Sequence, residues 1–239
     1  MRREEQIKDQ FLAIPMRPKT MFVYSARTSI LERIKYEAKT FKGTVLDIGC
    51  GIMPYRGLIE SNPAVEKYIG MDLEQPTYYA HVEPDLKWDG HTIPLEDASV
   101  DCVMATEVLE HCPEPDRVLT EIFRVTKTGG RFFATVPFVW NLHEVPYDEY
   151  RFTPYSIERH LRNAGFRDIR VEALGGWNVS LAQLLALWVE FSKRGFARSV
   201  LRMLVFPFYA LLVKTDRQPA TFDGMENSMF SGLSVTARK

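Results

Sequence analysis

The chain has 239 residues, of which 46% are hydrophobic and 26% charged, and its net charge is −1. These values are typical of a globular protein with one domain, or one domain and a large insertion, and they give no basic field for nucleic acid, so we expect no nucleic-acid partner. Three cysteines without a Cys-x-x-Cys spacing indicate a reducing compartment and no disulfide framework.

The N-terminal segment lacks the features of a targeting signal. Its first ten residues carry charges of both signs, and no run in the chain reaches the roughly 18–20 apolar residues of a membrane-spanning helix. We therefore expect a cytoplasmic protein. Residues 1–27, with two prolines, are expected to form an N-terminal arm. Residues 28–239 are expected to form the folded domain, starting with a helix over residues 28 to about 40.

Strand and helix patterns alternate along the rest of the chain. Apolar runs predict strands at residues 44–48, 67–71, 85–87, 99–105, 131–137, 166–172 and 230–238. Helical spacing predicts helices at residues 55–60, 115–125 and 154–164. The alternation predicts an α/β, Rossmann-like, doubly wound fold with a mostly parallel sheet. Residues 174–219 are too long for a simple connection and are expected to form a helical insertion before the last strand.

Residues 45–51 (VLDIGCG) place an acid and two glycines at the end of a buried strand. Gly49 and Gly51 let a ligand approach the backbone, as at nucleotide sites at the carboxyl end of a sheet. Asp47 would repel a pyrophosphate but suits a cationic amine. Asp72 ends the next strand, where a carboxylate can accept both hydroxyls of a ribose. These residues predict a nucleoside ligand that also carries an amine.

Five motifs in this order, DIGCG, GMDLE, WDGHTIPLEDASVDCV, EVLEH and KTGGRFF, resemble class I S-adenosylmethionine-dependent methyltransferases of the small, methyltransferase-11-like type. The resemblance covers residues 43–166 and the end, LSVTARK, which looks like the antiparallel last strand of that family's seven-stranded sheet. It implies S-adenosyl-L-methionine as the cofactor. The implied contacts are Asp47, Gly49, Cys50, Gly51, Asp72, Leu73, Asp89, Gly90, Thr106 and Glu107. Met53 stands where many members have a third glycine.

The segment 137–152 (PFVWNLHEVPYDEYRF) leaves the sheet on the side expected for the cofactor. It reads either as a polar loop with ring packing or as the acceptor pocket. In the second interpretation His143 is a general base that Glu144 or Asp148 orients, and both His143 and Glu144 are catalytic candidates. The candidate acceptor-binding residues are Trp140, Tyr147, Asp148, Tyr150 and Arg151. A similar loop occurs in bacterial methyltransferases associated with cell-surface saccharides.

Two further features leave alternatives open. Glu107 and Glu110 fit either a site or solvated acids at a helix start. His111 and Cys112 follow directly, but adjacent residues on a turn seldom converge on one ion, so we expect no metal. The insertion at 174–219 fits a helical cap over the sheet or an amphipathic surface for peripheral contact with a membrane or a lipid-linked substrate.

The resemblance therefore implies a methyltransferase for an unidentified small-molecule or saccharide acceptor, with a hydroxyl of a saccharide or lipid-linked saccharide as one candidate. The alternative is a non-catalytic S-adenosylmethionine-binding scaffold or partner subunit. A dinucleotide-dependent oxidoreductase is disfavoured, because the chain lacks the third glycine of the G-x-G-x-x-G pattern. The acceptor atom and the oligomeric state stay open.

Overall fold

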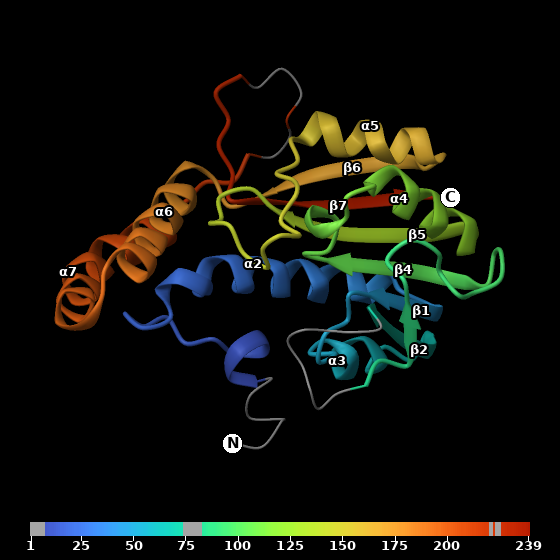
Figure 1. Cartoon of the computed structure of the whole chain (residues 1–239), viewed down its shortest axis with the longest axis horizontal. Coiled ribbons are helices and arrows are strands. Elements are labelled where there is room, and N and C mark those ends of the chain that lie inside the picture. Colours follow the sequence, from blue (N-terminus) through green and yellow to red (C-terminus); the bar gives the residue numbers. More distant parts are fainter. Residues whose placement is uncertain (1–7, 74–82, 220–221, 223–225) are drawn as a thin grey trace.

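A computed structural model describes residues 8–73, 83–219, 222 and 226–239 (Figure 1). Its centre is a seven-stranded sheet with the order β3-β2-β1-β4-β5-β7-β6. The strands are β1 (Gly43–Ile48), β2 (Val65–Leu73), β3 (Leu86–Trp88), β4 (Val100–Thr106), β5 (Thr126–Pro137), β6 (Arg167–Leu174) and β7 (Gly232–Arg238). The pairs among β1 to β5 are parallel, whereas β7 runs antiparallel to β5 and β6. The predicted fold class is thereby confirmed.

The sheet is covered on both faces, and residues along each central strand alternate between two hydrophobic cores. On β1, Val45 faces the core beneath α2 and α3, and Leu46 faces the core beneath α4 and α5. The apolar runs follow from this, since a parallel strand buried on both sides has no solvent face. The helices are α2 (Met21–Glu37), α3 (Arg56–Glu60), α4 (Pro115–Val125), α5 (Pro154–Ala164), α6 (Trp177–Ser192) and α7 (Gly195–Lys214).

The predicted elements exist, with differences at their ends. Helix α2 begins at Met21 and not at residue 28, so the predicted helix start was wrong. The stretch Met21–Arg27 is rich in aromatic and β-branched residues and is a poor helix former by itself. Its helix is stabilised by tertiary contacts, because Ser25 donates to Gln183 of α6 at 2.7 Å and Gln183 donates to the Phe22 carbonyl at 2.7 Å.

The insertion forms the helical pair α6–α7, as predicted, but it does not cover the sheet. Figure 1 shows the pair projecting beyond one end of the sheet, with α6 in contact with the N-terminal half of α2. Its buried side chains join α2 in a third apolar cluster that includes Met21, Ala182, Ala186, Val189, Tyr209 and Leu212. The cap interpretation of the insertion is therefore wrong, since the pair extends the fold sideways.

Candidate active site

The carboxyl ends of β1, β2, β3 and β4 lie at one edge of the sheet, as their parallel pairing requires. The turn after β1 is fastened to the end of β2 by two hydrogen bonds. The Cys50 N–H donates to the Met71 carbonyl at 3.1 Å, and the Gly51 N–H donates to Asp72 Oδ2 at 2.7 Å. The two acids singled out in the sequence are thus brought to one place.

Asp47 is a buried carboxylate with one unpaired oxygen. Tyr68 on β2 donates its hydroxyl proton to Asp47 Oδ2. Asp47 Oδ1 has no hydrogen-bond partner among the residues that the structure describes. Burial raises the pKa of Asp47 to about 7, Tyr68 counteracts this, and the charge of Asp72 adds to it. Because a buried acid with a free oxygen is costly, this geometry suits a ligand that brings a donor or a positive charge.

The turn after β1 exposes backbone where a side chain would not fit. Gly49 has φ +65°, and a Cβ there would lie 2.5 Å from Cγ2 of Val108. Met53 also adopts a left-handed conformation, with φ +53°. The turn therefore keeps a glycine-like path at Met53, at a cost of about 1–2 kcal/mol for a residue with a side chain. Cys50 is buried in the core beneath α2 and α3, where burial raises the pKa of its thiol.

The ends of β2 and β3 carry the second acid and a short polar turn. Asp72 Oδ1 accepts the N–H of Leu73 at 2.8 Å, and the Leu73 side chain is exposed. Asp89 Oδ1 accepts the N–H groups of His91 and Thr92 at 2.8 and 2.7 Å, which lowers the pKa of Asp89. A Cβ on Gly90 would lie 3.4 Å from Leu73 Cδ2, so these two residues are neighbours.

Two glutamates follow β4. Glu107 is partly buried and Glu110 is buried. Glu107 has φ +55°, and its Oε1 accepts the hydroxyl proton of Thr135 on β5 at 2.8 Å. Glu110 lies on the short turn η3 (Leu109–His111) with 0% exposure, and neither carboxylate oxygen has a hydrogen-bond partner among the described residues. Burial raises the pKa of both acids, and the charge of Glu107 adds to the effect on Glu110. The interpretation of Glu110 as a solvated acid is therefore wrong.

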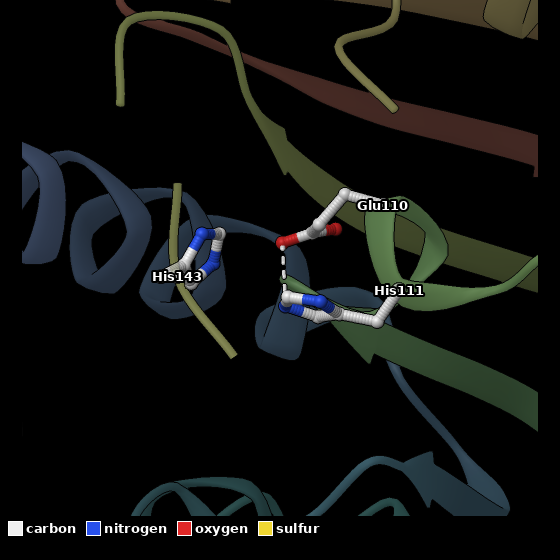
Figure 2. Close-up of side chains that lie close together, drawn as sticks. All are labelled: Glu110, His111 and His143. Atoms are coloured by element: carbon white, nitrogen blue, oxygen red, sulfur yellow. Dashed lines mark ion pairs between the residues drawn. The ribbon is translucent and has the colours of Figure 1, made fainter. Parts of the chain in front are cut away.

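The loop between β5 and α5 (residues 138–153, the β5–α5 loop) is fastened to η3. The Glu110 carbonyl accepts the N–H groups of Glu149 and Tyr150 at 2.9 and 3.1 Å. His111 Nδ1 lies 3.0 Å from the Tyr147 carbonyl. As a result, the imidazole of His143 meets that of His111 with ring centroids 4.7 Å apart. Figure 2 shows Glu110, His111 and His143 gathered from these two segments.

His143 is oriented by Asp148. Its Nδ1 lies 3.2 Å from Asp148 Oδ2, which also accepts the His143 N–H at 3.1 Å. Arg151 donates to both Asp148 oxygens at 2.6 and 2.8 Å and holds the pKa of that carboxyl well below its usual range. Burial lowers the pKa of His143 despite the charge of Asp148. Arg151 therefore fixes the position of Asp148, and Asp148 fixes the orientation of the His143 imidazole.

The other residues predicted in this loop have different surroundings. Trp140 approaches His143 edge-on, with ring centroids 6.5 Å apart, and Tyr147 is exposed. Tyr150 donates to the Pro113 carbonyl at 3.1 Å. Glu144 has φ +50°, and its Oε2 lies 3.8 Å from His111 Nε2. Of the two acids that could orient His143, Asp148 makes that contact.

Sequence reasoning did not assign two residues that shape the site, Tyr68 and Arg27. Tyr68 was hidden in a strand pattern, and its role as the partner of Asp47 depends on the β1–β2 register. Arg27 lies in the predicted arm, yet its charge acts on both Tyr55 and Glu107. Glu110 was considered in the sequence as a site residue or a solvated acid, and its burial is the part that the sequence did not indicate.

Comparison with known proteins identifies the central segment. Residues 46–134 match the family described as "Methyltransferase domain". A probable S-adenosylmethionine-dependent methyltransferase of Mycolicibacterium smegmatis is 34% identical over 99 residues, which cover 39% of this chain and 37% of that protein. An uncharacterized 37.1 kDa protein in transposon Tn4556 of Streptomyces fradiae is 31% identical over 134 residues, 50% of this chain and 38% of that protein. The chain spans less than two fifths of the length of either relative.

Solved structures resemble the whole chain. The crystal structure of a SAM-dependent methyltransferase from Archaeoglobus fulgidus covers 100% of both chains, with a TM-score of 0.55 and 19% identity. At this level of identity the likeness concerns the fold alone.

Proposed function

Because the chain carries a class I S-adenosylmethionine-dependent methyltransferase domain, we propose that it transfers a methyl group from S-adenosyl-L-methionine to an acceptor. The family match confirms the resemblance and the cofactor predicted from the motifs. The observation that carries the proposal is the buried Asp47, whose Oδ1 lacks a partner among the described residues beside a turn of accessible backbone. A cationic amine is a fitting partner for such an oxygen.

The residues at the carboxyl edge fit this cofactor. Asp47 Oδ1 would accept from the amino group, and the backbone of the turn at Gly49 would lie against the methionyl part. Asp72 would accept the ribose hydroxyls, because each carboxylate oxygen keeps a lone pair after accepting one backbone N–H. Asp89 and the Gly90 backbone would bind the adenine edge. When bound, the cofactor supplies a methyl group already activated by the sulfonium charge.

The acceptor would bind on the side of the β5–α5 loop. Asp148 engages Nδ1 of His143, which leaves Nε2 to meet an acceptor hydroxyl. Asp148 and Arg151 act as positioning residues, since they hold the imidazole and do not face the acceptor themselves. Glu144, exposed and 3.8 Å from His111 Nε2, is the second catalytic candidate of this loop.

We propose a saccharide hydroxyl, free or lipid-linked, as the acceptor. Trp140 lies edge-on to His143 and Tyr147 is exposed in the same loop, and aromatic rings of this kind can pack against sugar rings. The test is S-adenosylhomocysteine formation with a panel of monosaccharides, nucleotide sugars and lipid-linked saccharides, with amines as the contrasting class. Turnover only with amines would refute the hydroxyl assignment. Cofactor binding without turnover on either class would favour the non-catalytic scaffold.

The outer face of α6–α7 supports peripheral contact with a membrane. On α6 the large exposed apolar residues recur at intervals of three and four, at Trp177, Leu181, Leu184, Trp188 and Phe191. On α7 they are Phe196, Val200, Met203, Leu204, Phe208 and Leu211. Among the described residues, α7 is the one helix long and apolar enough to cross a membrane by length and composition, and few of its residues are buried. The expectation that no segment is long and apolar enough to span a membrane was wrong. Arg198 and Arg202 interrupt the apolar residues in the sequence, but they do not end helix α7.

The charges around this outer face favour an anionic bilayer. Arg198 and Arg202 are paired with Glu190, whereas Arg194 at the α6–α7 turn and Lys214 at the helix end are exposed and basic. We therefore propose that the protein is cytoplasmic and binds peripherally to the inner face of the membrane through α6–α7. Sedimentation with phosphatidylglycerol liposomes tests this. The variant is Leu204→Glu/Phe208→Glu, and the control is Leu142→Glu, which changes an exposed residue of the β5–α5 loop. Equal sedimentation of all three proteins would refute it.

A further inference from the structure

Glu110, His111 and His143 place three metal-binding groups at one point. One ligand atom from each residue lies within 4.8 Å of the other two. Glu110 Oε1 is 3.7 Å from His111 Nε2, the contact drawn in Figure 2. We propose that these three residues bind a divalent transition cation of the Mn²⁺ or Zn²⁺ class.

The first argument is the state of Glu110. Its carboxylate has 0% exposure, and neither oxygen has a hydrogen-bond partner among the residues that the structure describes. Buried carboxylates are usually paired with a cation or coordinate a metal. The imidazole of His111 lies 3.7 Å from Glu110 Oε1, beyond hydrogen-bond distance, and the hydrogen bonds of Arg151 go to Asp148 and to the carbonyls of Tyr150 and Asn141. A metal ion would supply the missing partner.

The second argument is the orientation of the two imidazoles. A carbonyl oxygen can only accept, so His111 Nδ1, 3.0 Å from the Tyr147 carbonyl, carries the proton. The Asp148 carboxylate assigns the proton of His143 to Nδ1 in the same way. Both Nε2 atoms therefore present lone pairs. Metal-binding histidines are held in this manner by a carbonyl or carboxylate on the other nitrogen.

The third argument is the ligand set. One carboxylate and two imidazoles form the mixed nitrogen and oxygen set that suits Mn²⁺, Fe²⁺, Co²⁺ and Zn²⁺ and lacks the thiolates that favour Cu⁺. Glu144 Oε2, 3.8 Å from His111 Nε2, and Glu107 lie next to the cluster. Three protein ligands leave coordination positions open, as in catalytic metal sites. The expectation of no metal rested on adjacent residues in sequence, whereas His143 reaches the cluster from a different loop.

The inference rests on the proposed methyl transfer for its purpose. A cation here would bind the acceptor oxygen and favour loss of its proton to water. The new O–C bond then forms from the oxygen lone pair, and the electrons of the broken S–C bond remain on sulfur. When the cation is bound, His143 Nε2 is one of its ligands. The cation then replaces His143 as the group that promotes loss of the acceptor proton.

Calorimetric titration of the full chain, first treated with a chelator, tests the site without cofactor or acceptor. We expect one equivalent of Mn²⁺ or Zn²⁺ to bind with a micromolar dissociation constant. Glu110→Gln, His111→Ala and His143→Ala should each weaken binding at least tenfold, and Asp148→Asn should weaken it through the orientation of His143. His160→Ala, on α5 and paired with Asp116, is the matched control and should bind as the wild type does.

X-ray absorption of the zinc-loaded wild-type protein provides a measurement that needs no variant. Two imidazole nitrogens and carboxylate oxygen around zinc are expected. No saturable binding by the wild type, or equal binding by all variants including His160→Ala, would overturn the proposal. Because neither measurement uses S-adenosyl-L-methionine, failure of the metal site leaves methyl transfer untouched. Failure of cofactor binding would likewise leave the metal result standing.

Discussion

The affinity of the protein for S-adenosyl-L-methionine should rise with pH through the titration of Asp47. Burial raises the pKa of this carboxyl to about 7, so near neutral pH the free protein carries it partly protonated. The cationic amine of the cofactor is attracted only by the ionised form. With a pKa of about 7, the ionised fraction grows about fivefold between pH 6 and pH 7, and the association constant should grow by the same factor. The amino group of the cofactor, with an ordinary pKa of about 8, stays charged over this range.

The raised pKa of Asp47 also affects the stability of the free protein, which should fall as the pH rises. Its folded-state pKa lies above its ordinary value of 3.8, so the native state binds the proton more tightly than the unfolded chain does. This contribution to stability is present below pH 4 and is lost as pH rises through about 7. Asp47→Asn should therefore raise the melting temperature at pH 8 while it abolishes the pH dependence of cofactor binding.

Calorimetry at pH 6, 6.5 and 7 in buffers of different ionisation enthalpy measures both the affinity and the proton released. Asp168→Asn is the matched control, because Asp168 is exposed on β6 and its left-handed backbone suits asparagine. Tyr68→Phe removes the donor that lowers the Asp47 pKa and should move the rise in affinity to higher pH. If wild type and Asp47→Asn show the same pH dependence, the role assigned to Asp47 is wrong.

Outcomes for four further variants are expected. Gly49→Ala should cost about 1–3 kcal/mol of stability and weaken cofactor binding, because its Cβ would meet Val108 at 2.5 Å. Gly129→Ala, also at positive φ but with no atom within 4 Å, should cost about 1 kcal/mol in urea unfolding and leave binding intact. Asp148→Asn should lower turnover with S-adenosyl-L-methionine affinity unchanged, and equal loss of both would contradict its positioning role. Gln183→Ala should cost about 1–3 kcal/mol, because it removes the acceptor of the buried Ser25 hydroxyl and the donor to the Phe22 carbonyl, and no change in the urea midpoint would contradict this.

The parallel core was predictable because its signals are local. Val45, Leu46 and Ile48 flank an acid at the end of one buried strand, and this pattern indicates both the strand and the ligand edge. Pro115 and Pro154 stand at the first positions of α4 and α5, where proline marks a helix start, and both starts were predicted correctly. The start of α2 was missed because its stability comes from Gln183, 161 residues away from Phe22 in sequence.

The carboxyl edge of the sheet was easier to predict than the packing of the β5–α5 loop for the same reason. Asp47 and Asp72 belong to motifs of fixed spacing, whereas the contacts of Glu110 with the β5–α5 loop depend on how two loops pack. Burial could not be deduced for Glu110, since a Glu-His pair before a helix is usually solvated. The direction in which α6–α7 projects depends on its packing against α2. The sequence of the pair therefore fitted both a buried cap and an exposed apolar surface.

Calorimetric titration of the purified full chain with S-adenosyl-L-methionine, run in parallel with NAD, examines the claim on which the other proposals depend. Binding of one equivalent of S-adenosyl-L-methionine in the micromolar range, lost in Asp72→Ala, and no heat with NAD are the predicted results. A folded protein that binds neither compound, or that binds NAD instead, would contradict the assignment of the carboxyl edge as a site for a nucleoside with a cationic amine.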